Sequence, residues 1–203
     1  MNVTVFEAIN ITKKYRNTLA LNQVSMSVMQ GDIYGFIGEN GAGKTTMIRL
    51  LTGLAEPTTG KIALFGESNK KLAKQRERIG CIIESPSLYL DMTAYENLEV
   101  QRLQRGIPGK GCIDNALALV GLKDTGKKKA KDFSLGMRQR LALAIALLGN
   151  PEFLVLDEPI NGLDPTGIIE LRNLLKRLNK ERGITILISS HILTEPVSYT
   201  HLT

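Results

Sequence analysis

A glycine-rich loop at residues 38–45, with the sequence Gly-Glu-Asn-Gly-Ala-Gly-Lys-Thr, constrains the fold of this chain more than any other feature. The loop follows the apolar residues 33–37, which predict a strand, and it precedes residues 47–51, which have helical character. Glycines at these spacings, followed by Lys44 and Thr45, are typical of a loop that binds phosphate between a strand and a helix. An ordinary glycine-rich turn is the alternative, and the flanking strand, Lys44 and Thr45 favour the phosphate loop over it.

Each residue type in this loop has a physical role in binding a nucleotide. Glycines let the backbone curl so that successive N–H groups point inward, and the following helix contributes the positive end of its dipole. Lys44 supplies a point charge for the β- and γ-phosphates and is predicted to be catalytic as well as nucleotide-binding. The Thr45 hydroxyl can bind Mg²⁺. The residues predicted to bind the nucleotide here are Gly38, Asn40, Gly41, Ala42, Gly43, Lys44, Thr45 and Thr46.

The composition indicates one domain with a sizeable core, since the 203 residues are 43% hydrophobic. The net charge of +6 suits phosphate groups and is also compatible with nucleic acid or an anionic membrane surface. Only 5% of the residues are aromatic, so we see no stacking platform and expect no nucleic acid partner. Cys81 and Cys112 show no metal or disulfide spacing, and the apolar surroundings of Cys81 predict a core position.

Nothing in the sequence predicts a membrane-spanning segment or a secretory leader. The longest strongly apolar run, at residues 141–148, is too short to cross a bilayer. We therefore expect a cytoplasmic location, with any membrane role coming through another polypeptide.

The order of the expected strands and helices predicts an α/β fold. Strands are expected at residues 3–9, 24–28, 33–37, 61–65, 78–84, 153–156 and 184–189, with a polar turn at residues 13–17. Helices are expected after the phosphate loop and at residues 94–103, 113–120, 134–148 and 168–181. The pattern favours a mostly parallel sheet with N-terminal antiparallel strands and an inserted helical subdomain. The core would comprise about residues 1–84 and 149–195, and the helical subdomain about residues 85–148.

Two carboxylates follow the apolar strand at residues 153–156. A buried strand would deliver Asp157 to the edge of the sheet where open α/β folds bind ligands, and there it could hold Mg²⁺. Glu158 could orient and deprotonate an attacking water. Strands often end in polar turns, so this pair becomes specific only together with the phosphate loop.

Ser134 is a natural N-cap for the helix that continues to about residue 148. An ordinary capped core helix is the alternative reading of this segment. Its place in the chain between the phosphate loop and the strand that ends in Asp157 favours a functional role.

Taken in order, these motifs resemble the ATP-binding cassette, the ATPase subunit of ABC transporters, over about residues 3–195. Residues 38–45 match the Walker A loop of that family, and residues 153–157 resemble its Walker B strand. Residues 134–140 resemble the signature motif, and residues 161–164 resemble the D-loop. The resemblance implies a P-loop NTPase core and a single nucleotide-binding domain.

The resemblance also implies roles for single residues. Glu158 falls at the catalytic carboxylate, His191 at the switch histidine, and Tyr15 at the aromatic that stacks on adenine. A structural histidine and a half-buried surface tyrosine are the alternatives for the last two. In the head-to-tail dimer of the family, Ser134 and the N–H of Gly136 would face the γ-phosphate bound by the other subunit. The implied cofactors are ATP and Mg²⁺, and the implied partners are a second ATPase subunit and a membrane-spanning permease, with the chain peripheral at the cytoplasmic face.

Some residues depart from the common family pattern. Leu135 and Met137 replace a glycine and a glutamine of the signature, and Glu84 stands where most members carry a glutamine. An ionised glutamate only accepts hydrogen bonds, and its charge would be tolerated near Mg²⁺, so Glu84 is a predicted metal ligand with Thr45 and Asp157. These departures are similar to cassettes associated with bacitracin and lantibiotic resistance, which favours an exporter of antibiotic or antimicrobial-peptide type. The alternative is that Glu84 is neutral variation in its loop and indicates no transported class.

Two other functions fit parts of the pattern. A soluble cassette without a transporter is one, although such relatives usually carry tandem cassettes or long coiled coils and this chain has neither. A small-molecule kinase with a phosphate loop is another, and it would leave residues 134–140 unexplained. Residues 196–203 follow no helical period, and we expect the natural chain to be truncated near Glu195 with a foreign tail.

Overall fold

The structure, a computed structural model, describes residues 3–84 and 87–191. Within these residues the strands form two four-stranded sheets, with the orders β2-β1-β4-β5 and β3-β8-β7-β6. The antiparallel sheet consists of β1 (Thr4–Tyr15), β2 (Thr18–Met29), β4 (Thr59–Leu64) and β5 (Glu67–Ser68). The parallel sheet consists of β3 (Ile33–Ile37), β6 (Ile79–Ile82), β7 (Phe153–Leu156) and β8 (Thr185–Ser190). The tail expected at residues 196–203 lies outside the described residues.

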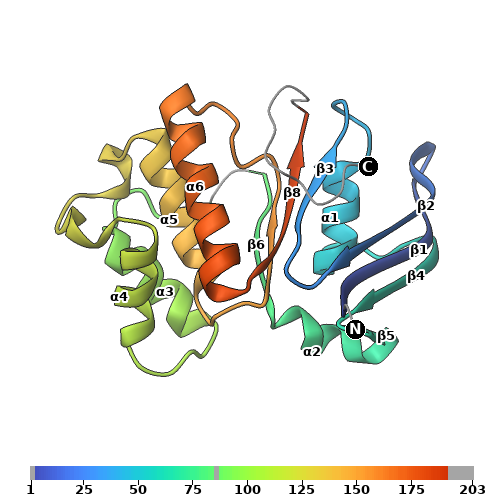
Figure 1. The fold of residues 1–203 in the computed structure, drawn as a ribbon, viewed down its shortest axis with the longest axis horizontal. Coiled ribbons are helices and arrows are strands. Elements are labelled where there is room, and N and C mark those ends of the chain that lie inside the picture. The colour runs from blue at the N-terminus through green and yellow to red at the C-terminus, as the bar shows by residue number, and fades with distance from the viewer. Residues whose placement is uncertain (1–2, 85–86, 192–203) are drawn as a thin grey trace.

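Helices cover both faces of the parallel sheet (Figure 1). They are α1 (Lys44–Thr52), α2 (Leu72–Arg76), α3 (Ala94–Gln104), α4 (Gly111–Leu119), α5 (Leu135–Leu147) and α6 (Pro165–Arg182). Short 3-10 helices are η1 (Asn69–Lys71), η2 (Lys123–Thr125) and η3 (Ala130–Asp132). In Figure 1, α5 and α6 lie on one side of the parallel sheet, and α1 lies on the other beside the antiparallel sheet. The predicted α/β fold class is confirmed, while α2 was not predicted.

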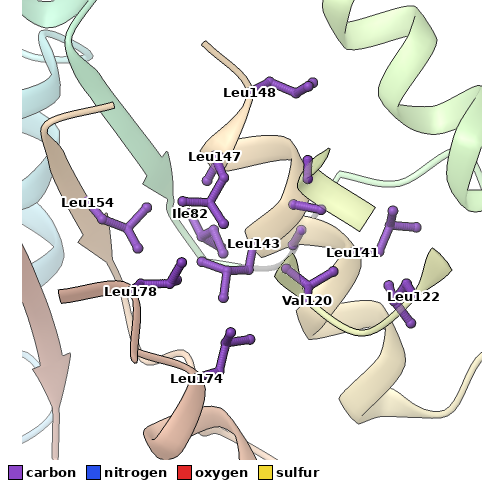
Figure 2. Packing of buried hydrophobic residues seen from close by; sticks show 14 of the residues in the cluster. Ile82, Val120, Leu122, Leu141, Leu143, Leu147, Leu148, Leu154, Leu174 and Leu178 are labelled. Carbon is purple, nitrogen blue, oxygen red and sulfur yellow. The ribbon is translucent and has the colours of Figure 1, made fainter. Parts of the chain in front are cut away.

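The parallel sheet separates two hydrophobic clusters. β7 and β8 are buried along their whole length, and their side chains alternate between the clusters. Leu154 and Ile186 face the cluster built with helices α3 to α6. Val155 and Leu187 face the cluster built with α1 and the antiparallel sheet. Burial of both faces explains why β7 reads as a continuous apolar run and why the middle of β8 is apolar. Figure 2 shows the first cluster, where Ile82 and Leu154 of the sheet meet Leu143 and Leu147 of α5 and Leu174 and Leu178 of α6.

The N-terminal hairpin is longer than the sequence predicts. β1 and β2 each contain 12 residues and pair as far as Tyr15↔Thr18, so only Arg16 and Asn17 form the turn. The prediction of two short strands separated by a polar turn at residues 13–17 is therefore wrong. An antiparallel sheet can expose one face to water, so the polar residues at the end of β1 remain compatible with a strand.

Cys81 is exposed, and the prediction of a core position is wrong. It lies on β6, which is an edge strand of the parallel sheet, and its neighbours in sequence, Gly80 and Ile82, take the buried positions. Its thiol lines a groove of about 170 Å³ together with Leu88 of the following loop and Ala142 and Ile145 of α5. Atoms around this groove partly desolvate the thiol, which raises its pKa.

Helix α3 begins with a capping box. Thr93 Oγ1 accepts a hydrogen bond from the Glu96 N–H at 3.2 Å, and the Glu96 carboxylate accepts one from the Thr93 N–H at 2.7 Å. These two bonds satisfy two donors that a helix start would otherwise leave free. The bonds that the Glu96 carboxylate accepts from the Thr93 N–H and, at 3.0 Å, from the Thr93 hydroxyl lower the pKa of that carboxyl. The cap thereby fixes α3 where Leu98 enters the core.

Replacing Thr93 with Ala is expected to lower the free energy of unfolding by about 1 kcal/mol, the usual effect of losing an N-cap side chain. Urea denaturation measures this change. Thr166→Ala is the control, because Thr166 is an exposed residue in the first turn of α6 whose N-cap is Asp164. Equal stability of the Thr93 variant and the parent would show that the cap contributes nothing.

Candidate functional site

The glycine-rich loop joins β3 to α1 in a conformation that its glycines permit. Gly41 and Gly43 have φ values of 86° and 91°, in the left-handed region that other residues rarely adopt. At Gly43 a Cβ atom would also lie 2.6 Å from the Ala20 carbonyl oxygen. Among the described residues no side chain caps α1, and its first turn holds no acidic residue. The first amides of α1 are therefore available to an anion.

Lys44 points back into this loop. Its ammonium is buried and donates hydrogen bonds to the carbonyl oxygens of Gly38 at 2.6 Å and Glu39 at 3.0 Å. The same nitrogen lies 3.4 Å from Glu158 Oε1. A buried cation within the loop is the charge that a phosphate would require.

Asp157 lies directly after β7 and contacts both the loop and β8. Its carboxylate is buried and accepts a hydrogen bond from the Thr45 hydroxyl at 2.8 Å through Oδ2. Its other oxygen, Oδ1, accepts a hydrogen bond from the Ser189 hydroxyl at 2.6 Å. The structure thus brings the predicted metal-binding residues Thr45 and Asp157 together.

Glu158 turns its carboxylate toward two other predicted site residues. Its Oε2 lies 2.8 Å from Nδ1 of His191, and its Oε1 contacts Lys44. The backbone of Glu158 has a φ of 49°, and its N–H donates to Ser189 Oγ at 2.8 Å. Three residues predicted to be catalytic, from α1 and from the segments after β7 and β8, therefore form one contiguous group.

Glu84 is placed differently from its prediction. Its carboxylate pairs with the guanidinium of Arg49 on the exposed side of α1, and it does not join the hydrogen-bonded group of Thr45 and Asp157. Its role as a metal ligand stays a prediction.

Tyr15 lies at the end of β1 and is 41% exposed, with Lys13 Nζ 4.7 Å from the centre of its ring. An exposed ring at this place can receive a planar group. The part of Tyr15 in adenine stacking stays a prediction.

Ser134 and Gly136 line a second groove, of about 500 Å³, at the start of α5. Ser134 Oγ caps the helix by accepting the Met137 N–H at 3.2 Å, as predicted. A Cβ on Gly136 would come no closer than 3.9 Å to Leu163, so packing inside one chain does not require glycine there. The opposite wall is formed by residues 162–164, 166 and 167 and by Glu170. Among the described residues, none of the phosphate loop lines this groove.

Comparison with known proteins decides the family. A family model described as ABC transporter matches residues 21–161, which is more than half of the chain. The chain belongs to the ABC transporter family. The resemblance seen in the sequence motifs is therefore confirmed.

Within the ABC transporter family the chain is similar to proteins named for peptide antibiotics. It is 52% identical to the bacitracin transport ATP-binding protein BcrA of Bacillus licheniformis over 95% of this chain, and it spans 63% of that protein's length. It is 45% identical to the lantibiotic transport ATP-binding protein SrtF of Streptococcus pyogenes, covering 92% of this chain and 80% of SrtF. Among solved structures, it is similar to a dimeric post-hydrolysis state of the ATP-binding cassette MJ0796 with ADP and Pi. That match has a TM-score of 0.79 and 27% identity, and it covers 93% of this chain and 88% of the other.

Two residues near the site of this ABC cassette, Ser189 and Arg49, were missed by sequence reasoning. Ser189 bridges Asp157 and Glu158, and Arg49 pairs with Glu84. The only available signal for Ser189 was a pair of hydroxyl residues inside an apolar strand just before His191. Arg49 had no distinguishing signal, because an arginine on a helix is usually only a solvated residue.

Along residues 3–84 and 87–191 we find no helix of the length and apolarity that crossing a membrane requires.

Proposed function

We propose that this chain is the ATP-binding and ATP-hydrolysing subunit of an ABC transporter that exports an antibiotic or antimicrobial peptide. The observation that carries the proposal is the contiguous group of Lys44, Thr45, Asp157, Glu158 and His191 at the end of the parallel sheet. The names of the bacitracin and lantibiotic relatives support the transported class, and those names also favour a transporter over a cassette that acts without one.

ATP would bind in the glycine-rich loop. Its phosphates would accept hydrogen bonds from the loop amides and from the start of α1, where the helix dipole favours negative charge. Lys44 would exchange its bonds to the carbonyls of Gly38 and Glu39 for the β- and γ-phosphates. Tyr15 would stack on the adenine ring from the end of β1.

The donor set near the loop fits Mg²⁺. The Thr45 hydroxyl and the Asp157 carboxylate are hard oxygen donors 2.8 Å apart, and Mg²⁺ in nucleotide sites uses one or two such groups besides phosphate and water. When bound, the ion would neutralise phosphate charge. Glu84 would bind the ion with Thr45 and Asp157 once its ion pair with Arg49 had broken.

Hydrolysis would depend on Glu158. Its carboxylate would take a proton from water as the water oxygen forms a bond to the γ-phosphorus, and the bond from that phosphorus to the oxygen of ADP would break. His191 contacts the carboxylate at 2.8 Å and would hold it toward the γ-phosphate. The products are ADP and inorganic phosphate.

The groove at Ser134 and Gly136 would meet the ATP bound by a second ATPase subunit. Its helix start and backbone N–H groups suit a γ-phosphate, and glycine at 136 leaves room for close approach although packing within the chain does not need it. The dimeric MJ0796 cassette supports such pairing. A membrane-spanning permease would be the other partner, which would place this chain at the cytoplasmic face of the membrane.

Lys44→Ala is expected to weaken ATP binding roughly 10- to 100-fold, from the ~1.5–3 kcal/mol of hydrogen bonds to a charged group. Equilibrium titration with a fluorescent ATP analogue measures this, and Lys176→Ala on the exposed face of α6 is the control.

A parent chain that neither binds ATP nor hydrolyses it with Mg²⁺ would reject the proposed function. Unchanged bacitracin and lantibiotic survival of cells that express the chain with its permease would reject the transported class.

A further inference from the structure

Asp157 needs more than Thr45 to hold its carboxylate in place. The side chain is only 2% exposed, and in the described part of the chain no Lys or Arg forms an ion pair with it. A buried carboxylate without a cation depends on hydrogen-bond donors. It has two here, the hydroxyls of Thr45 and Ser189, one on each oxygen.

These two donors come from different kinds of structure. Thr45 belongs to the loop and helix that would rearrange around a nucleotide. Ser189 belongs to β8, which pairs with β3 on one side and β7 on the other, and its side chain is fully buried. The register places Leu156 opposite Ile188, so the next residues, Asp157 and Ser189, lie side by side. Ser189 is therefore the fixed donor of the pair.

The same hydroxyl also holds the residue after Asp157. Ser189 Oγ accepts the N–H of Glu158 at 2.8 Å while it donates to Asp157 at 2.6 Å. The accepted bond fixes a turn in which Glu158 has a positive φ, and this turn points the Glu158 carboxylate at Lys44 and His191. One side chain thus connects the predicted metal carboxylate to the backbone of the predicted base.

We propose that Ser189 is a positioning residue for both carboxylates, orienting Asp157 toward Mg²⁺ and Glu158 toward the attacking water. This inference rests on the proposed ATP hydrolysis. Groups that orient a metal-binding side chain typically change metal affinity or activity by about 10- to 100-fold when removed. Ser189 acts through Asp157 and Glu158, so the affinity for metal-free ATP should not depend on it.

The test compares ATP binding with Mg²⁺ and with EDTA in a Glu158→Gln parent, which should bind ATP without turning it over. Ser189→Ala in this parent is expected to weaken binding with Mg²⁺ by roughly 10-fold or more and to leave binding in EDTA unchanged. Ser189→Thr keeps a hydroxyl and should restore most of the Mg²⁺-dependent affinity. In the chain with Glu158, Ser189→Ala should lower kcat at saturating ATP and Mg²⁺.

Thr185→Val is the matched control. Thr185 lies at the other end of β8, is equally buried, and its hydroxyl also forms a hydrogen bond, to the Gly31 N–H at 3.0 Å. It should leave the Mg²⁺ dependence of ATP binding unchanged. The proposal is overturned if Ser189→Ala keeps the parent's Mg²⁺ dependence, if it weakens binding equally in EDTA, or if Thr185→Val has the same effect. A parent that binds no ATP overturns the proposed function itself, and this is seen before any Ser189 variant is made.

Discussion

Replacing Glu158 with Gln is expected to leave ATP binding intact and to slow ATP hydrolysis by about 10²- to 10⁴-fold, the usual contribution of a general base. The amide has nearly the same shape as the carboxylate but cannot take a proton from water. The backbone N–H that donates to Ser189 is unaffected, so the turn after Asp157 should persist. Phosphate release measures turnover, and equilibrium titration measures ATP binding.

Glu152→Gln is the matched control for this substitution. Glu152 precedes β7 whereas Glu158 follows it, and its carboxylate forms an ion pair with Arg78 away from the phosphate loop. Loss of that pair should leave turnover unchanged. Parent-like turnover in the Glu158 variant would defeat the assignment of Glu158 as the base, whatever the control shows.

Replacing Gly43 with Ala is expected to disrupt the phosphate loop and to abolish ATP binding. A Cβ in the left-handed conformation costs about 1–2 kcal/mol. The clash with the Ala20 carbonyl adds roughly 1–3 kcal/mol, as overpacking does elsewhere, because that contact is to backbone on β2 and cannot rotate away. Thermal unfolding and ATP titration together measure the effect.

Gly41→Ala separates the two contributions. Gly41 has a similar φ of 86°, but a Cβ there would have no atom of another residue within 4 Å. This variant should therefore show only the cost of a Cβ in the left-handed backbone conformation, and its free energy of unfolding should fall by about 1–2 kcal/mol. Equal destabilisation by the two substitutions would mean that the approach of β2 to the loop does not matter.

The parts of the fold with a local signal could be predicted from the sequence. The strand, loop and helix around Lys44 are contiguous, so their glycines and polar residues identify them without any knowledge of neighbours. The same holds for β7, whose apolar run ends at Asp157, and for α5, which begins at its predicted cap Ser134. These elements supply most of the residues that the structure brings together.

Features that depend on tertiary neighbours could not be predicted. The polar end of β1 is a strand because β2 pairs with it, and Cys81 is exposed because β6 is an edge strand. A single sequence reveals neither strand order nor register. The pairing of Arg49 with Glu84 and the bridge made by Ser189 join segments more than 30 residues apart. Their geometry exists only after the sheet has formed.

The position of β8 between the two hydrophobic clusters has a mechanical consequence. Ile186 and Leu187 anchor the strand in opposite clusters, and close-packed interiors have low compressibility. The strand therefore cannot slide or twist without disturbing both clusters. The end of β8, where Ser189 lies just before His191, shares the stiffness of the whole interior. The end of β8 should therefore stay fixed when a nucleotide binds, and any rearrangement of the site should occur in the glycine-rich loop.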